Sequence, residues 1–493
     1  MNLWFREVRH LTKLGMSKEF MKLVWMAGFV FLAFSSFGWG SEKDQKKPNV
    51  IYILADDLGY GDLGCYGQKV IQTPNIDKMA VEGMVFSQHY SGSTVCGPSR
   101  SCMLQGKHSG NTYVRGNGYL QMRLDPQDQI FPSALQKAGY HTALIGKSGL
   151  GCNTDDALLL KKKGFDYFFG FTSHTAAHWY YPPYLWRNTQ RVQYPNNTQH
   201  AGDQYSSENV IHEALQYLER QKDGPFFLHL AFQLPHASLR AKEEWKAKYR
   251  PILKEKVLDS KEHQHYSWER EPKTTYAAMV SYMDHNVGLI LKKLDELGLA
   301  ENTLVMFASD NGAMQEGGHR RDSFHSSGEL RGGKRDLYEG GVRVPMIAWW
   351  PGKIKAGSST DHVSAFWDIS PTLRELAGAE PQLDTDGISI VPTLLGRGKQ
   401  AQHKNLYWEF YEGKGKRAIR QGKWKLVCLN TNTQRKPKME LYDLDNDLSE
   451  TKDLSKKYPE LVAELYKQMD ELHTMSEHKK FRLAAEVLEQ PKK

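Results

Sequence analysis

The sequence predicts an α/β fold in which a large mixed sheet is sandwiched between helices, with a small C-terminal α+β subdomain. Short, nearly continuous apolar runs are typical of buried strands, and they alternate along the chain with segments of helical periodicity. Residues 275–298 and Val210–Leu218 each place their apolar residues on one helical stripe. The apolar runs are Asn49–Ala55, His141–Gly146, Phe226–Phe232, Thr303–Ala308 and Val344–Trp350.

The character of the chain changes after residue 396. Three short strand-like pieces separated by basic, turn-rich stretches follow there, and Tyr458–Leu472 has the periodicity of a helix. We therefore expect a large domain over residues 46–395 and a small subdomain with an antiparallel sheet and a helix over residues 396–493. The three short pieces are Ala418–Arg420, Trp424–Cys428 and Glu440–Tyr442.

Composition narrows the function classes. The 493 residues are 40% hydrophobic and 25% charged, which excludes an intrinsically disordered chain and a multi-span membrane protein. Five cysteines are too few for a disulfide scaffold. Because their number is odd, at least one of them has a role other than pairing within the chain. The net charge of +8 is compatible with an anionic partner but is too weak to indicate nucleic acid, and we expect none.

The first forty residues have the pattern of a signal peptide. Leu23–Phe34 is an apolar run that is short for a membrane span, basic residues precede it and small residues follow it. We expect residues 1–40 to be cleaved on export, which predicts a periplasmic or extracellular protein with no stable membrane span after cleavage. The alternative is an uncleaved anchor. Without these residues the net charge falls to about +5.

Four oxygen-bearing side chains follow two of the predicted strands. Asp56 and Asp57 end the first run, and Asp310 and Asn311 follow Thr303–Ala308. Binding residues gather beyond the carboxyl ends of strands in such sheets, and an all-oxygen set suits Ca²⁺ or Mg²⁺. A two-zinc site would use histidines, and none adjoins these pairs in the sequence. The alternative is ordinary turn chemistry, in which Asp and Asn are common.

A second candidate is the segment Cys96-Gly-Pro-Ser-Arg100. Proline in the first turn marks a helix start, where free backbone N–H groups attract anions. Arg100 adds a cation one turn along. By composition alone, the segment favours a buried cysteine at the start of a helix.

Cys96-Gly-Pro-Ser-Arg100 resembles the motif of the type I, formylglycine-dependent sulfatases, an arylsulfatase-like family of the alkaline-phosphatase superfold. The resemblance extends over residues 48–475 and is greatest to bacterial polysaccharide and glycosaminoglycan sulfatases. It implies that residues 46–395 form the catalytic domain. Further matching segments are Asn49–Asp57, Gly59–Gly64, Thr73–Asp77, Gly164–Asp166, Pro235–His236, Ser309–Gly312, Arg331–Lys334, Glu339–Pro345, Trp424–Leu426 and Leu441–Leu444.

The resemblance implies the chemistry. A formylglycine-generating maturation enzyme would oxidise Cys96 to formylglycine (3-oxoalanine), whose aldehyde hydrates to a gem-diol. One diol oxygen would attack sulfur and leave a covalent sulfo-enzyme, and the second hydroxyl would then expel sulfate. We therefore expect a secreted sulfatase that hydrolyses sulfate esters of a polysaccharide or oligosaccharide.

The resemblance also assigns the metal site. Asp56, Asp57, Asp310 and Asn311, together with the modified Cys96, would hold a divalent cation that acts as a Lewis acid. The family favours Ca²⁺, with Mg²⁺ as the alternative.

The same resemblance gives catalytic roles to four cationic or titratable side chains. Arg100 would steady the diol, and Lys147 and Lys334 would bind sulfate oxygens. His236, alone or with Lys334, would protonate the leaving oxygen and contact the substrate.

One departure leaves alternatives open. Where the family often reads Gly-Lys-Trp-His-Leu-Gly, this chain reads Gly146-Lys-Ser-Gly-Leu-Gly151, with Gly149 in place of the histidine that helps to expel sulfate. The base for that step is unassigned. A phosphodiesterase or phosphonate hydrolase of the same superfold, or a sulfated-glycan-binding pseudoenzyme, remain alternatives.

Two segments are candidates for sugar recognition. His319, Arg320, Arg321 and His325 follow Asp310 closely, and we expect some of them to bind hydroxyls or a carboxylate of the substrate. The stretch 174–195 is rich in histidine, tyrosine and tryptophan, whose faces suit a sugar ring, although packing on the domain surface would also explain it.

Overall fold

The computed structural model describes residues 46–117, 122–123, 128–149, 158–259, 266–433 and 436–488. Its contacts divide the chain into Met1–Lys46 and Lys47–Lys493, and all elements described below belong to the second unit. The predicted signal peptide, residues 1–40, lies outside the described residues, as does Cys152. In the part of the chain that the structure describes, no helix combines the length and the apolar character that a membrane span requires.

Within the described residues, eleven strands form one mixed sheet. They are β1 (Asn49–Ala55), β2 (Met84–Tyr90), β3 (His141–Lys147), β4 (Tyr167–Phe171), β5 (Tyr184–Arg187), β6 (Gln190–Gln193), β7 (Phe226–Ala231), β8 (Thr303–Ser309), β9 (Arg343–Trp349), β10 (Ser358–Thr360) and β11 (Ser364–Ala365). Their order is β10-β2-β9-β8-β1-β7-β3-β4-β5-β6, with β11 beside β2. β1 pairs in parallel with β7 and β8, whereas β9 is antiparallel to β2 and β8.

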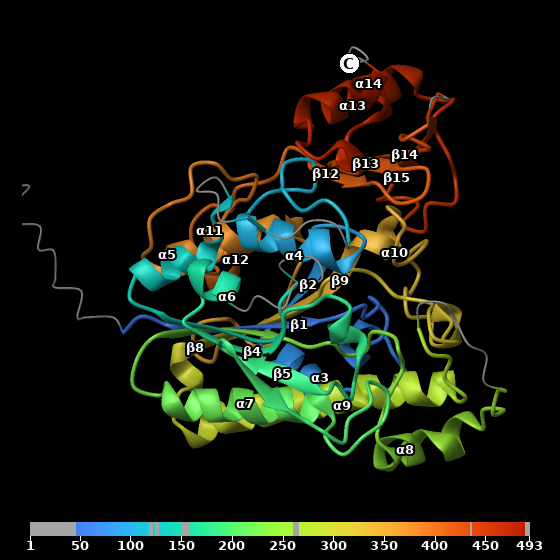
Figure 1. Ribbon diagram of the computed structural model, residues 1–493. Coiled ribbons are helices and arrows are strands. Elements are labelled where there is room, and N and C mark those ends of the chain that lie inside the picture. The colour runs from blue at the N-terminus through green and yellow to red at the C-terminus, as the bar shows by residue number, and fades with distance from the viewer. Residues whose placement is uncertain are drawn as a thin grey trace, which may run out of the picture. The chain divides into compact units, whose positions relative to one another are not determined.

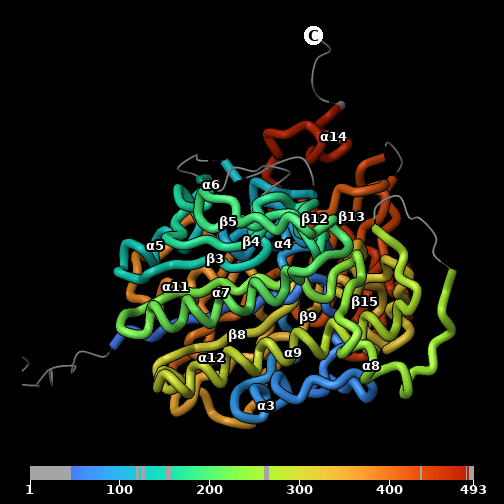
Figure 2. Tube along the Cα trace, turned by 60° about the horizontal axis from the view of Figure 1, so that its bottom comes forward, coloured from blue at the N-terminus to red at the C-terminus, as the bar shows by residue number. Residues whose placement is uncertain are grey.

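Helices cover both faces of this sheet, which confirms the predicted sandwich (Figure 1). They are α3 (Pro74–Glu82), α4 (Cys96–Gln105), α5 (Phe131–Lys137), α6 (Leu158–Lys162), α7 (Ser206–Arg220), α8 (Glu243–Leu253), α9 (Pro272–Glu296), α10 (Glu339–Val342), α11 (Ile369–Ala377) and α12 (Val391–Leu395). The helices α4, α5 and α11 lie on one face and α3, α7 and α9 on the other. In Figure 2, α7 and α9 run along the sheet beside each other.

The period-two alternation of β1 explains why both faces are covered. Ile51 and Ile53 belong to the core that includes residues of α3, α7 and α9. Tyr52 and Leu54 belong to the core that includes residues of α4, α5 and α11. Because successive side chains of a strand point to opposite faces, an apolar run needs a hydrophobic layer on each side.

A small antiparallel sheet follows, as the sequence predicts. It contains β12 (Leu406–Phe410), β13 (Lys416–Gln421), β14 (Trp424–Leu429) and β15 (Lys438–Asp443) in sequence order, with α13 (Pro459–Leu472) and α14 (Ala484–Leu488) after it. Ile419, Leu426 and Leu441 form a core with Leu465 and Met469 of α13. The predicted boundary at residue 396 stays a prediction, since Lys47–Lys493 is one compact unit.

The strand order places the functional side chains. β1 lies between β7 and β8, and β3 lies on the other side of β7, all four in parallel. Their carboxyl ends therefore meet at one edge of the sheet, and the residues that follow them come together there.

Candidate active site

The four predicted oxygen ligands lie together at this edge. Ala55 of β1 is paired with Ser309 of β8, so the residues after each strand are neighbours. The backbone N–H of Asp57 donates to Oδ1 of Asp310 at 3.1 Å, and Nδ2 of Asn311 donates to Oδ1 of Asp57 at 2.7 Å. Asp56, Asp57, Asp310 and Asn311 are all fully buried.

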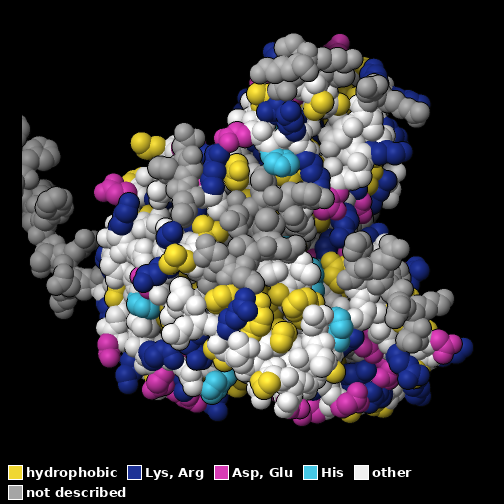
Figure 3. Space-filling model, in the orientation of Figure 1, with side chains coloured by type: hydrophobic (Ala, Val, Ile, Leu, Met, Phe, Trp, Pro, Cys, Tyr) yellow, Lys and Arg dark blue, Asp and Glu magenta, His cyan; other side chains and the backbone are white. Residues whose placement is uncertain are grey.

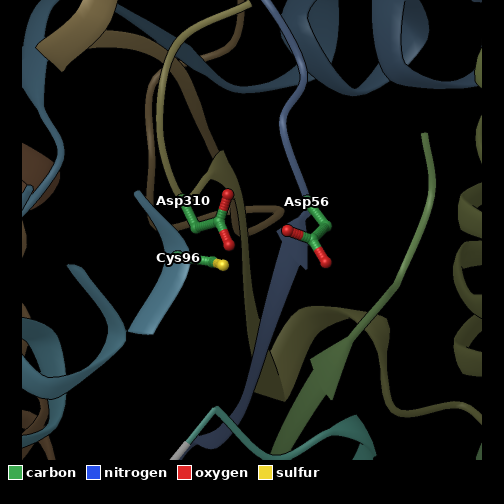
Figure 4. Close-up of side chains that lie close together, drawn as sticks. All are labelled: Asp56, Cys96 and Asp310. Atoms are coloured by element: carbon green, nitrogen blue, oxygen red, sulfur yellow. The ribbon is translucent and has the colours of Figure 1, made fainter. Parts of the chain in front are cut away.

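Cys96 is the first residue of α4, where the sequence predicts a helix start. Figure 4 shows its sulfur pointing toward the space between the carboxylates of Asp56 and Asp310. One ligand atom from each of these three residues lies within 4.8 Å of the other two. Burial raises the pKa of the Cys96 thiol to about 11, so the thiol is protonated at neutral pH and is a poor nucleophile in that form.

Each carboxylate of the site faces a buried cation. Nζ of Lys147, at the end of β3, lies 2.6 Å from Oδ2 of Asp56. Nη2 of Arg100, one turn into α4, lies 2.8 Å from Oδ2 of Asp310. Nζ of Lys334 lies 2.7 Å from Oδ2 of Asp57. Buried charges need partners of this kind, and the pairing fixes the three cations around one centre.

The crowding of charge shifts the pKa values of the carboxylates in opposite directions. Burial disfavours the charged form of Asp56, but the neighbouring positive charges, chiefly that of Lys147, outweigh it and lower the pKa of Asp56. Burial and the neighbouring negative charge of Asp56 raise the pKa of Asp310 to about 7, against the opposing effect of Arg100. Two neighbouring carboxylates of one buried site therefore differ in how readily they take up a proton.

Two oxygens of this group show that a divalent cation fits. Among the described residues, Oδ1 of Asp56 and Oδ1 of Asn311 are buried and have no hydrogen-bond partner. Unsatisfied buried oxygens are costly, and carboxylate and amide oxygens are the ligands that Ca²⁺ and Mg²⁺ prefer. Although no histidine adjoins these pairs in the sequence, folding brings Nε2 of His236 to 3.2 Å from Oδ2 of Asp57.

Lys334 is held by a residue that no sequence motif marks. Its Nζ lies 3.1 Å from Nε2 of His236 and donates to Oε2 of Glu316 at 2.8 Å. The other oxygen of Glu316 binds Arg335. Glu316 lies six residues after Asp310, and no local pattern marks it as part of the site.

Two further residues touch Cys96 and were also not assigned from the sequence. Nε2 of His174 lies 3.1 Å from Sγ of Cys96, and Nδ2 of Asn117 lies 3.6 Å from it. Oδ1 of Asn117 also accepts the backbone N–H of Gly97 at 2.9 Å. His174 belongs to the stretch 174–195, for which the sequence leaves sugar recognition and surface packing open.

The four predicted substrate-loop residues occupy different environments. His319 is buried, and its ring stacks on that of Tyr276 at a centroid distance of 3.8 Å. Arg320 is exposed in an ion pair with a neighbouring aspartate, Arg321 is half-buried, and His325 is exposed. Their role in substrate binding stays a prediction.

A small aromatic-lined hollow lies at the carboxyl end of β4, the strand beside the one that carries Lys147. Phe171, Trp179, Tyr184 and Trp186 supply its aromatic lining, and Ser173 lines it next to His174. Aromatic faces with a few polar groups suit a sugar ring. On the outer face shown in Figure 3, by contrast, Lys and Arg are scattered among Asp and Glu, so the cations that distinguish this site are the buried ones.

Comparison with known proteins agrees with this geometry. The chain matches the family model described as Sulfatase over residues 48–379, and the model described as N-sulphoglucosamine sulphohydrolase, C-terminal, over residues 332–475. It is 32% identical over 425 residues to the N-acetylgalactosamine-6-sulfatase of Canis lupus familiaris, covering 80% of this chain and 74% of that protein. It is 31% identical over 414 residues to human arylsulfatase A, covering 77% and 74%. The crystal structure of Ps i-CgsB in complex with k-i-k-neocarrahexaose superposes with a TM-score of 0.72 at 28% identity, covering 86% of this chain and 92% of that one.

Proposed function

The chain belongs to the sulfatase family and is a sulfuric ester hydrolase, and from this premise we propose that it is secreted and removes sulfate from a sulfated polysaccharide or oligosaccharide. The observation that carries the proposal is the centre around Cys96, where three buried cations face three buried carboxylates. A carbohydrate substrate is supported by the named substrates of the relatives and by the aromatic side chains that gather at the carboxyl end of β4.

Lys147 and Lys334 are the groups that bind the sulfate. Both ammonium groups are almost fully buried and belong to different segments, so they approach a bound anion from two sides. Cations in a water-excluded site attract an anion more strongly than exposed ones do, and they need no reorganisation as negative charge builds on the bridging oxygen. The N-terminus of α4 adds a partial positive charge at residue 96.

Two groups that the family uses fit these residues. Asp56, Asp57, Asp310 and Asn311 with residue 96 would hold a divalent cation, with Ca²⁺ favoured, which would polarise a sulfate oxygen as a Lewis acid. Formylglycine formed from Cys96 would supply a hydrated aldehyde as the nucleophile in place of the protonated thiol.

His236 and Lys334 act on the leaving alcohol. Nε2 of His236 and Nζ of Lys334 are 3.1 Å apart, so a proton is held between them. Burial and the charge of Lys334 lower the pKa of His236, which keeps its ring neutral and leaves the proton on the ammonium group. The pair can therefore deliver a proton to the departing oxygen as its negative charge develops.

This function is tested by mass spectrometry of residue 96 together with assays of a sulfate ester and a phosphate ester. The protein is produced in a host with a working maturation system, and the peptide that contains residue 96 is weighed. We expect conversion of Cys96 to formylglycine, and release of sulfate but not of phosphate from matched aryl esters. Unconverted Cys96 with no ester cleavage would instead indicate a glycan-binding protein. Faster release of phosphate than of sulfate would indicate a phosphodiesterase.

Substrate, metal and export each need a separate measurement. A screen of defined sulfated oligosaccharides should show desulfation of at least one, and a chelator should abolish turnover until Ca²⁺ or Mg²⁺ is returned. Amino-terminal sequencing of the protein from the periplasm or medium should begin after residue 40. Retention of the full-length chain in the cells would contradict secretion.

A further inference from the structure

Gly149, two residues after Lys147 at the end of β3, has no room for a side chain. Gly149 has a φ of 61°, and an added Cβ would lie 2.2 Å from Cδ of Arg100. Arg100 cannot retreat without losing Asp310, to which its Nε and Nη2 donate at 2.9 and 2.8 Å. A basic side chain at position 149 is therefore incompatible with the present position of Arg100.

The space next to residue 96 is instead filled from the neighbouring strand. β4 pairs in parallel with β3, and Lys147 lies opposite Phe171. The two segments stay paired just beyond the ends of β3 and β4, because the backbone N–H of Ser148 donates to the carbonyl of Phe171 at 3.1 Å. The loop that follows Phe171 thus leaves the sheet at the same edge as Lys147, and three residues along it presents His174.

His174 faces the reacting position directly. Its Nε2 lies 3.1 Å from Sγ of Cys96, closer than either polar atom of Asn117. Asn117 carries an amide and is no base, so it cannot accept a proton from residue 96.

The other bases around the centre have different partners. Each of the three carboxylates bonds a cation: Asp56 with Lys147, Asp57 with Lys334 and Asp310 with Arg100. His236 is directed at Lys334 and Asp57. Among the described residues, His174 is the imidazole whose ring nitrogen is in contact with residue 96.

One further histidine packs against this ring and is itself stacked on His236. The ring of His178 meets that of His174 edge to face, with centroids 5.4 Å apart, and stacks on that of His236 at 4.2 Å. Tyr266 packs against both His178 and His236 at 5.4 Å. A ring packed in this way loses little freedom when it acts, because its neighbours already restrict its rotation.

We propose that His174 is a catalytic residue of this chain and takes the proton from residue 96 in the step that releases sulfate. The proposal rests on the proposed function. In this step Nε2 of His174 accepts the proton of the remaining hydroxyl on residue 96. The electron pair of that O–H bond becomes the second bond of the aldehyde carbonyl. The bond between carbon and the sulfate oxygen breaks, sulfate departs with the bonding pair, and the proton later passes to solvent.

The test compares His174→Ala and His174→Gln with the wild-type protein. In both variants residue 96 should be converted to formylglycine as in the wild type, which mass spectrometry of the unreacted protein shows. With excess aryl sulfate, each variant should release one equivalent of aryl alcohol in a burst and then turn over about 10²- to 10⁴-fold more slowly than the wild type. The peptide with residue 96 should then carry sulfate in the variants and not in the wild type.

Two controls make the result specific. His212→Ala removes an exposed histidine of α7 and should leave turnover and the mass of residue 96 as in the wild type. Free imidazole should restore turnover in His174→Ala, where the ring leaves a space, and not in His174→Gln, where an amide fills it. The glutamine variant also keeps the loop packed if alanine disturbs its fold.

The outcomes separate this proposal from the proposed function. If the wild type is unconverted or releases no aryl alcohol, the proposed function fails. If the wild type is active and the variants turn over normally, or lose the burst without accumulating sulfate on residue 96, only the role of His174 is overturned.

Discussion

Replacement of Glu316 by glutamine tests whether a charge outside the predicted site holds Lys334 in place. Burial raises the pKa of Glu316, but Lys334, His236 and Arg335 outweigh this effect and lower it from 4.5 to about 2. A shift of that size corresponds to about 3 kcal/mol in favour of the charged form. Glutamine keeps the shape of the side chain and one acceptor oxygen, so we expect about 1–3 kcal/mol of the free energy of unfolding to be lost in E316Q.

The pH dependence gives the sign of this effect. Because folding lowers the pKa of Glu316, its stabilisation is fully present above its ordinary value of 4.5 and is lost as the pH falls toward 2. Urea unfolding of wild type and E316Q at a series of pH values should therefore show a difference that is constant near neutrality and shrinks below about pH 4.5.

A matched control removes the second partner of Arg335. Glu412 binds Nε of Arg335 at 3.3 Å, but both side chains are about two-fifths exposed. Pairs of this kind contribute about 0–1 kcal/mol, so E412Q should cost little. Equal losses in E316Q and E412Q, or a difference that grows on acidification, would refute the account of Glu316.

Two further predictions concern packing and buried charge. Gly149→Ala should displace Arg100, because the new Cβ lies too close to it, and should add about 1–2 kcal/mol of backbone strain at a φ of 61°. The melting temperature and kcat on an aryl sulfate should therefore both fall. An unchanged kcat would contradict the position of Arg100. Lys425 lies 2.8 and 3.1 Å from the fully buried carboxylates of Glu339 and Glu450, so Lys425→Met should lower the free energy of unfolding by about 3–5 kcal/mol, measured from denaturant midpoints. A methionine variant as stable as the wild type would show that these charges are not coupled.

The buried strands of the fold could be predicted from the sequence because each is apolar on both faces. Asn49–Ala55 is found with the predicted bounds, and the run predicted from His141 extends one residue further, to Lys147. β2 was missed because Ser87, Gln88 and His89 interrupt its apolar pattern. It nevertheless forms, because β9 pairs with Met84–Phe86 and with His89–Tyr90 on either side of an irregularity and holds β2 in the sheet.

The charged centre was partly predictable for a related reason. Side chains that follow parallel strands converge, so the pairs after β1 and β8 could be placed together from their positions alone. His174, Asn117 and Glu316 could not be placed in this way. Their contacts depend on which strand lies beside β3 and on the paths of loops, and no repeat or spacing in the sequence encodes either.

The small sheet has a structural part in the site that the sequence does not reveal. Nε1 of Trp408 donates to the carbonyl of Ser91 at 2.9 Å, across 317 residues, and the backbone N–H of Glu409 donates to Oγ of Ser109 at 2.7 Å, across 300 residues. Ser91 precedes α4 and Ser109 follows it, so β12 is bonded to the chain on both sides of the helix that begins with Cys96. Because residue 96 lies between the carboxylates of Asp56 and Asp310, the sheet that anchors both ends of this segment helps to hold it in the position that the proposed reaction requires.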